Sequence, residues 1–434
     1  MNKTVFIPII PKKYRWIFSN SYIEELFIYG NTDSCFKDKL IFRTRYIIFI
    51  YICIETLFRF LLYFVKQFFI PVVLNKEKVL SIILESGKGY GCSNIYKIFD
   101  INQKVNISIK AFHLKDYMKL GRVDAFLFGK NILSAILDYY TTLSFNFSDK
   151  VISLSLKQGA SYITRYSYMK TQFFLLHKKY PDCVVYTDSG SIPSHASISA
   201  GFKTIHLYHG LMSHIHPNTF PDYYSIYVYS KDEKEYLLKV GVDSEVYIYP
   251  SIALKFKTNS VIFFMPADIS NNLNLDTVLK ELVELFNLFE RYSYKIFIKL
   301  HPLCYVNNSF SKEYKLSYTN WYEALDFIKN YNLIDEDNAS VALSKLKPSF
   351  LVGLHGSTVL CEGLNLGIIP IGIFKPDKKI LDSVAYRDPH VYKINERSLS
   401  WPLDLEIINS VLGEKKSYAY DNIIRKLCCN SPKN

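Results

Sequence analysis

The chain has 434 residues, of which 49% are hydrophobic, and a formal net charge of +12. This length excludes a single ordinary core, and the apolar content supplies ample material for two domains. The charge favours an acidic partner: a membrane surface, an anionic glycan, a nucleotide or nucleic acid. The eight cysteines are scattered without metal-type spacing, which indicates reduced thiols in the cytosol.

Residues 1–76 differ in character from the rest. Met1–Lys13 lacks the long apolar core of a signal peptide, whereas Tyr46–Phe64 approaches the length of a membrane span. Glu55 and Arg59 lie within that stretch, where ionisable groups are costly in hydrocarbon, although they can pair at i,i+4. A monotopic or interfacial helix, a buried helical hairpin and a transmembrane span all remain open. We expect an attachment segment, because cations that suit anionic lipid flank the stretch: Lys37, Lys39, Arg43, Arg45 and Lys66.

From Lys78 onward, short apolar runs alternate with helical patterns, which predicts a parallel sheet with crossover helices. The predicted strands of this first part are Val79–Glu85, Asn106–Phe112, Ala125–Gly129, Cys183–Thr187, Thr204–Tyr208, Tyr224–Tyr229 and Glu245–Tyr249. The predicted helices include Tyr162–His177 and Lys231–Val240. After the first strand comes a glycine-rich turn with Gly87 and Gly89, which is either a ligand loop or a flexible joint.

A second α/β part begins after Pro250–Ser260. Its predicted elements are the strands Val261–Met265, Lys295–Leu300, Phe350–Leu354 and Ile369–Phe374 and the helices Leu273–Tyr292, Trp321–Asn330 and Val359–Leu366. The predicted organisation is therefore an N-terminal helical segment (1–76) that associates with a membrane or packs, two Rossmann-like domains (77–255 and 256–400) facing a cleft, and C-terminal helices (401–434) that can cross back.

Polar clusters follow four of these strands. They are Asp188 with Gly190, His209 with Gly210, Lys299 with His301 and Pro302, and Gly356, Ser357 and Thr358 with Glu362. Open α/β sheets bind ligands outside the carboxyl ends of their strands, so all four clusters can face one cleft. A helix that begins at Ser357 offers free backbone N–H groups and hydroxyls to an anion. The pattern predicts a phosphate site for a nucleotide-linked substrate.

These motifs resemble those of bacterial surface-polysaccharide glycosyltransferases of the GT-B architecture. The sialyltransferase, polysialyltransferase and capsule Kdo transferase groups share an acidic-Gly, a His-Pro and a Ser-Ser/Thr motif. The CDP-glycerol polyol-phosphate transferases share His-Gly and Lys-x-His-Pro. The resemblance covers about residues 180–375, and this chain has Asp188-Ser-Gly190 where the first groups carry two acidic residues. It implies an acceptor domain followed by a donor domain.

The resemblance implies that His301 and Pro302 contact the donor nucleotide and that Ser357 and Thr358 hold its phosphate. Lys299 and Glu362 are further donor-site candidates, and Gly87, Gly89, Gly190 and Gly210 are loop candidates on the acceptor side. Asp188 and His209 both remain open as the base that deprotonates the acceptor. Each of these side chains also has a structural alternative, such as a helix cap for Asp188, Ser357 and Thr358.

His206, His209, His214 and His216 suggest a metal only weakly, because no cysteine or carboxylate completes a known spacing. We expect transfer without a metal or other cofactor, with protein cations and helix ends stabilising the phosphate in place of an ion.

The expected function is transfer from a nucleotide sugar, preferably a CMP-activated sialic-acid-like sugar or Kdo, onto a glycan or lipid-linked glycan of the capsule or lipopolysaccharide. The expected location is the cytoplasmic face of the bacterial inner membrane. Alternatives are a polyol-phosphate transferase, a sugar-nucleotide epimerase and a non-catalytic basic binding protein. No nucleic-acid partner is expected, because no nucleic-acid-binding motif occurs. The acceptor, the linkage, and inversion or retention at the anomeric carbon stay open.

Overall fold

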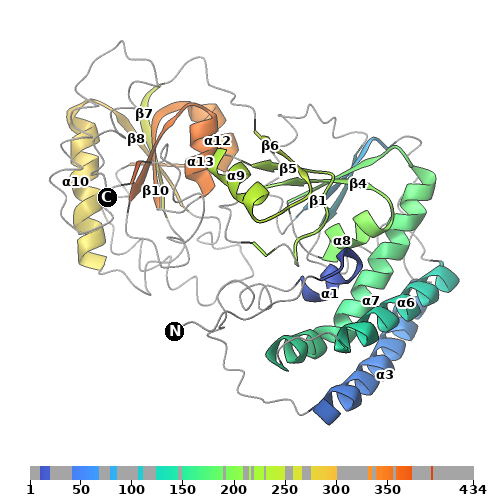
Figure 1. The fold of residues 1–434 in the computed structure, drawn as a ribbon. Helices are drawn as coiled ribbons and strands as arrows, with labels where there is room; N and C mark the ends of the chain where they lie inside the picture. Colours follow the sequence, from blue (N-terminus) through green and yellow to red (C-terminus); the bar gives the residue numbers. More distant parts are fainter. Residues whose placement is uncertain are drawn as a thin grey trace. The chain divides into compact units, whose positions relative to one another are not determined.

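Two compact α/β units make up the chain (Figure 1). Unit 1 comprises Met1–His209, His214–Val228 and Lys234–Tyr247, and unit 2 comprises Gly210–Ser213, Tyr229–Glu233 and Ile248–Asn434. The computed structural model describes residues 10–19, 42–67, 79–85, 106–110, 124–144, 149–188, 192–208, 215–216, 219–228, 231–249, 258–265, 275–300, 331–334, 339–354, 358–373 and 392–393. The predicted domain boundaries at residues 76, 255 and 400 stay predictions.

The sheet of unit 1 has the strand order β2-β1-β3-β4-β5-β6. The pairs β1–β2, β1–β3, β3–β4 and β4–β5 are parallel. The strands are β1 (Ser81–Glu85), β2 (Asn106–Lys110), β3 (Val184–Thr187), β4 (Lys203–Leu207), β5 (Ser225–Val228) and β6 (Glu245–Ile248). Central strands such as β1 are buried, as expected for a parallel sheet whose two faces are covered.

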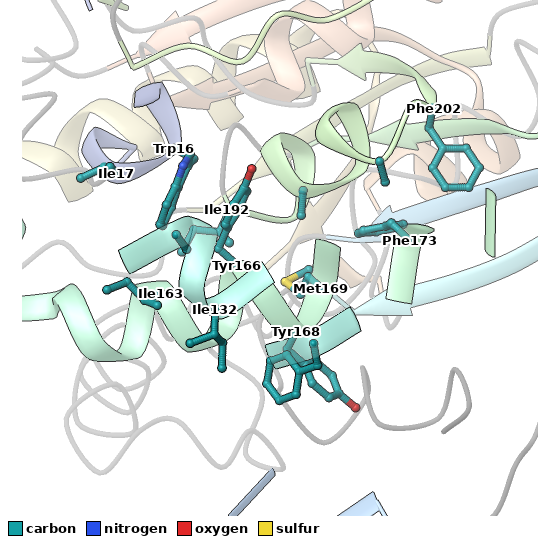
Figure 2. Close-up of a cluster of buried hydrophobic side chains, with 14 of the residues drawn as sticks. Trp16, Ile17, Ile132, Ile163, Tyr166, Tyr168, Met169, Phe173, Ile192 and Phe202 are labelled. Carbon is teal, nitrogen blue, oxygen red and sulfur yellow. The ribbon is translucent and has the colours of Figure 1, made fainter. Parts of the chain in front are cut away.

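Helices supply most of the core of unit 1. They are η1 (Lys12–Tyr14), α1 (Arg15–Phe18), α3 (Phe42–Gln67), α6 (Ala125–Leu143), α7 (Asp149–Lys179) and α8 (Ile192–Ser199). A further helix, α9 (Lys231–Lys239), begins in unit 2 and continues in unit 1. Figure 2 shows the centre of this core, where the Trp16 ring stacks on Tyr166 with 4.0 Å between ring centroids. The part of the N-terminal segment from Ile10 to Phe18 is therefore a component of the unit 1 core.

The predicted strand Ala125–Gly129 is wrong, because these residues form the first turn of α6. The Asp124 side chain accepts a hydrogen bond from the Leu127 backbone N–H at 2.6 Å and caps the helix. From Phe128 onward the buried residues recur at helical spacing, at Phe128, Ile132, Ala135 and Tyr139. A short apolar run fits both periods, and only the longer pattern distinguishes them.

The sheet of unit 2 has the strand order β12-β11-β10-β7-β8-β9. All five neighbouring pairs are parallel. The strands are β7 (Thr258–Phe264), β8 (Lys295–Lys299), β9 (Asn332–Leu333), β10 (Pro348–Leu354), β11 (Ile369–Ile373) and β12 (Tyr392–Lys393). The helices are α10 (Leu275–Arg291), α12 (Ala339–Leu346) and α13 (Thr358–Asn365). β8 and β9 thus lie on one side of β7, and β10, β11 and β12 lie on the other, which is the order of nucleotide-binding Rossmann folds.

The predicted α/β class with two Rossmann-like sheets is confirmed. The cleft between the two domains and the helices predicted after residue 400 stay predictions, since residues 401–434 and Trp321–Asn330 lie outside the described residues.

Candidate functional site

The carboxyl edge of the unit 2 sheet has its topological switch point between β7 and β10. These two strands are neighbours, and the chain leaves them toward opposite sides of the sheet. In open α/β sheets the crevice at such a point is the usual ligand site. The loops that follow β10 and β7, together with the one after the adjacent β8, are therefore the candidate site of this unit.

The turn after β10 delivers a helix directly to the switch point. β10 ends at Leu354 and α13 begins at Thr358, so Gly356 and Ser357 belong to a three-residue connection. These two residues lie outside the described part, and Thr358 is described only through its backbone. The first backbone N–H groups of α13 have no partner within the helix and can bind an anion.

Two glycines let α13 lie close against β10. A Cβ at Gly363 would overlap the Leu351 Cδ2 methyl, and a Cβ at Gly353 would lie 3.4 Å from Leu360 Cδ2. The helix ends in a Schellman motif, in which the Ile368 N–H bonds to the Gly363 carbonyl at 2.9 Å and Gly367 has a φ of 69°. The start of α13 is thus held at a fixed place on the sheet edge.

The end of β8 places a buried cation one strand beyond β7. Lys299 is 1% exposed, and its Nζ donates to the Leu300 carbonyl at 3.4 Å. The Met265 N–H bonds to the Lys299 carbonyl at 2.9 Å and ties the ends of β7 and β8 together. His301 and Pro302 come next in sequence but lie outside the described residues.

The strand order brings the ends of β8 and β10, after which the two predicted donor motifs follow in sequence, to one edge of the unit 2 sheet. β10 and β8 are both neighbours of β7, so their carboxyl ends are separated by two strand spacings, about 10 Å. One nucleotide can bridge that distance. Glu362, one turn into α13, is half-buried. The roles of Lys299, His301, Pro302, Gly356, Ser357, Thr358 and Glu362 stay predictions.

In unit 1 the switch point lies between β1 and β3, and Asp188 directly follows β3. Asp188 is 6% exposed, and α8 begins four residues later, at Ile192. Beside it, Thr187 Oγ1 and Ser194 Oγ are 3.3 Å apart and link the strand end to the helix. The glycine-rich turn follows β1, the other strand at this switch point. Its residues Gly87 and Gly89 lie outside the described residues, as does Gly190.

The second base candidate, His209, comes two residues after β4, the strand next to β3. His209 and Gly210 lie outside the described residues. The neighbouring His206 is buried in aromatic surroundings, with its ring stacked on Tyr223 at 4.7 Å between centroids. Among the residues that the structure describes, no three His, Cys, Asp or Glu side chains are grouped to hold a metal ion.

In unit 1 a buried histidine, His195, had no signal in the sequence. His195 on α8 is fully enclosed, with its Nε2 3.3 Å from the Thr219 carbonyl oxygen. Burial and the positive charge of Arg15 together lower the pKa of His195 to about 3, against the hydrogen bond to Thr219, which raises it. Burial and then Arg15 also lower the pKa of His216. These residues lie far apart in the sequence, and none falls at the end of a predicted strand.

Lys12 connects the N-terminal segment to the same unit. Its Nζ lies 2.9 Å from Asp222 and 3.0 Å from Asp243. Hydrogen bonds to Asp222 and then Asp243 raise the pKa of Lys12. All three side chains are well exposed, so the pairs contribute little stability individually.

Comparisons with known proteins give only distant likenesses. No protein-family model matches the chain, and no curated protein sequence matches it. Among solved structures, Acinetobacter baumannii MurG aligns over 81% of this chain and 95% of its own, with 7% identity and a TM-score of 0.38. Phytolacca americana UGT2, complexed with UDP-2fluoro-glucose and pterostilbene, aligns over 82% of this chain and 94% of its own, with 10% identity and a TM-score of 0.40. Both TM-scores are too low to transfer any property of these proteins to this chain.

Proposed function

We propose that the chain is a nucleotide-sugar glycosyltransferase of the GT-B architecture. The observation that carries the proposal is the strand order of unit 2, which is that of nucleotide-binding sheets. That order brings the ends of β8 and β10, after which the His-Pro and Ser-Thr motifs follow in sequence, to the two flanks of β7. The motifs and the strand order are independent observations, because the motifs follow from residue patterns that contain no information on strand order.

The proposed reaction forms a bond between an acceptor oxygen and the anomeric carbon of the donor sugar, while the bond from that carbon to the donor phosphate breaks. The leaving nucleotide keeps the electron pair of the broken bond. His301 and the start of α13 with Ser357 and Thr358 stabilise the negative charge that develops on the phosphate. Lys299 adds positive charge at the same edge, and Glu362 accepts hydrogen bonds from ribose hydroxyls.

The acceptor hydroxyl loses its proton to a base in unit 1, either Asp188 or His209. Asp188 is supported by its place at the carboxyl end of β3 beside the switch point. No step requires a metal ion, because protein cations and helix N–H groups stabilise the phosphate.

Within this class we propose a CMP-activated acidic sugar, sialic-acid-like or Kdo, as donor and a cell-surface glycan of the capsule or lipopolysaccharide as acceptor. The acidic-Gly, His-Pro and Ser-Thr order of the motifs supports this choice. His209-Gly210 supports the second candidate, a polyol-phosphate transferase with a CDP-linked donor. The proposed location is the cytoplasmic face of a bacterial inner membrane.

Calorimetric titration of the purified chain with CMP, CDP, UDP and ADP tests the nucleotide site. We expect a cytidine nucleotide to bind and His301→Ala and Ser357→Ala each to weaken binding at least tenfold. Lys345→Ala, on the exposed side of α12 in the same unit, is the control and keeps the affinity. Equal binding by all three variants, or no binding of any nucleotide, contradicts the proposed site.

Turnover assays with CMP-sugars, UDP-sugars and CDP-glycerol then identify the donor. For the base, we expect Asp188→Asn or His209→Gln to lower kcat by about 10²- to 10⁴-fold while nucleotide affinity is unchanged. If neither substitution slows transfer, the proposed mechanism is wrong.

A further inference from the structure

Helix α3 has an inner face that packs on the rest of unit 1. Ile52 and Thr56 are buried, and Ile52 lies against Gly159 of α7, where a Cβ would come within 2.8 Å of Ile52 Cδ1. Phe60 contacts Phe128 of α6 with 5.0 Å between ring centroids. Figure 1 shows α3, α6 and α7 side by side in unit 1. The helix is therefore a component of this unit.

The outer face of α3 is apolar from Tyr46 to Val65. Its exposed side chains recur at steps of three and four residues, which places them on one face of the helix. They are Tyr46, Ile47, Ile50, Tyr51, Ile54, Leu57, Phe58, Leu61, Leu62 and Val65. The most exposed of them is Ile47, with 67% of its surface exposed. An exposed apolar surface of this extent on a folded unit indicates an interaction site.

Helix α6 extends this face. Phe126, Leu133, Leu137 and Tyr140 are exposed at steps that again share one side of the helix, and Phe126 is 85% exposed. Tyr140 lies against Phe49 of α3 with 5.7 Å between ring centroids, so the two exposed stripes adjoin. We call these fourteen exposed side chains of α3 and α6 the α3–α6 face.

The packing of α3 decides between lying on a bilayer and crossing it. Tyr46–Val65 is long and apolar enough to cross a membrane. A crossing helix, however, would bring α7 into the hydrocarbon with it, because α7 covers its inner face. α7 carries the half-buried Arg165 and Lys170, and such ionisable groups are costly in hydrocarbon. Half-buried Glu55 and Arg59, paired at 2.7 Å, border the apolar stripe on α3 itself.

Charge identifies the occupant. The first turn of α3 contains Arg43 and Arg45 and no acidic residue, and Lys66 is the second-last residue of the helix. The positive end of the helix dipole adds to the two arginines. Anionic lipid headgroups complement cations at both ends of an apolar stripe. A second copy of the chain would instead bring like charges together on a two-fold axis.

We propose that the α3–α6 face rests in the plane of an anionic bilayer, with α3 as a monotopic helix and α6 as a second lipid contact. This inference specifies the membrane partner of the proposed function but does not depend on the transfer reaction. α6 enters only through the structure, since the sequence pattern gave its first turn as a strand.

Vesicle co-sedimentation of the full chain tests the face. The vesicles contain phosphatidylglycerol and phosphatidylethanolamine, with pure phosphatidylcholine for comparison. We expect the unaltered chain to bind the anionic vesicles at least tenfold more tightly. The double variants Ile54→Glu with Leu61→Glu on α3, and Leu133→Glu with Leu137→Glu on α6, should each lower the partition coefficient at least tenfold.

The matched control is Leu238→Glu with Val283→Glu, which adds the same charges at exposed apolar positions on α9 and α10. It should bind vesicles like the unaltered chain. Circular dichroism and cytidine-nucleotide titration of every variant show that the fold is intact, and a loss of vesicle binding with unchanged nucleotide binding separates this face from the proposed reaction. If either the α3 variant or the α6 variant binds the vesicles as tightly as the unaltered chain, the proposal of a shared face is wrong.

Orientation is measured with Ile47→Trp, Ile54→Trp and Leu61→Trp, which lie seven residues apart on one side of α3. Quenching by lipids labelled at different depths should place all three indoles at the same depth. The fluorescence of the unsubstituted chain, which has three tryptophans of its own, is subtracted first. A deeper position for residue 54 than for 47 and 61 would mean that α3 crosses the bilayer, which overturns the proposal. The proposal is also overturned if the unaltered chain does not bind vesicles and sedimentation velocity shows it to be a dimer that the same glutamate substitutions dissociate.

Discussion

At the scale of single residues, His195 shows how packing sets chemistry that the sequence leaves hidden. Its ring is enclosed in unit 1, and its Nε2–H donates to the Thr219 carbonyl. The enclosed imidazole stays neutral, because a proton there would be buried beside Arg15. The pKa of about 3 lies well below the ordinary value of 6.5.

This shift predicts a pH dependence of stability. Between pH 6.5 and about 3 the unfolded chain binds a proton at residue 195 that the folded chain does not, so the free energy of unfolding falls as the pH is lowered. The slope is about 1.4 kcal/mol per pH unit within that window. His195→Gln keeps an amide donor for Thr219 and cannot titrate.

Urea unfolding at pH 8, 6 and 5 measures the effect. The unaltered chain should lose more stability than His195→Gln between pH 6 and pH 5, and the two should run parallel above pH 7. Parallel curves throughout would show that the imidazole is accessible to protons in the folded chain. Asp124→Asn, at the α6 cap, is the control. This variant keeps His195, so it should still lose the stability between pH 6 and pH 5 that His195→Gln retains.

Residues at strand ends could be predicted from the sequence, whereas enclosed polar residues could not. Asp188 follows an apolar run of strand length, and its place after β3 was read from that run. His195 lies among small residues of α8. Its hydrogen bond to residue 219 and its electrostatic interaction with Arg15 join parts of the chain that are distant in sequence, which no local pattern reveals. Sequence patterns report local period, while burial depends on tertiary contacts.

At the scale of elements, α13 links packing to the proposed donor site. Gly363 lies where the helix touches β10, and any side chain there meets the buried Leu351. We expect Gly363→Val to move α13 away from the sheet and to destabilise unit 2 by about 1–3 kcal/mol, the usual cost of overpacking. Because the start of α13 moves with the helix, the affinity for the cytidine nucleotide should also fall.

Thermal unfolding and calorimetric titration of Gly363→Val test this coupling. Lys345→Val on α12 is the control, since it introduces the same β-branched residue at an exposed helix position of unit 2. It should cost only the small loss of helix propensity and leave nucleotide affinity unchanged. A Gly363→Val chain that is destabilised yet binds nucleotide normally would separate α13 from the ligand.

Elements with a clear period were predictable to within a few residues. The predicted strands Lys295–Leu300 and Phe350–Leu354 correspond to β8 and β10, and the predicted helix Leu273–Tyr292 corresponds to α10. The error at Ala125–Gly129 arose because five apolar residues satisfy both periods, and the capping role of Asp124 was overlooked. The α3 helix was found as an apolar run, but which of its faces packs inward is a property of α6 and α7.

At the scale of the whole molecule, the sequence predicted two parallel sheets but not their strand orders. Alternation of strands and helices requires parallel pairing, and many orders satisfy it. The two orders differ: unit 1 has its switch point between β1 and β3, and unit 2 has it between β7 and β10. In unit 2 the order places the ends of β8 and β10, after which the His-Pro and Ser-Thr motifs follow in sequence, on either side of β7. The phosphate site itself stays a prediction.

The division into two units predicts that nucleotide stabilises one of them selectively. A ligand that binds only folded unit 2 raises its free energy of unfolding by about 2.7 kcal/mol at one hundred times the dissociation constant. In differential scanning calorimetry we expect CMP or CDP to move one unfolding transition upward by several degrees and to leave the other in place. Gly363→Val should lower the transition that responds to nucleotide, and His195→Gln at pH 5 should alter the other. Nucleotide that stabilises only the transition sensitive to His195→Gln would place binding in unit 1, and then the loops after β8 and β10 are not the donor site.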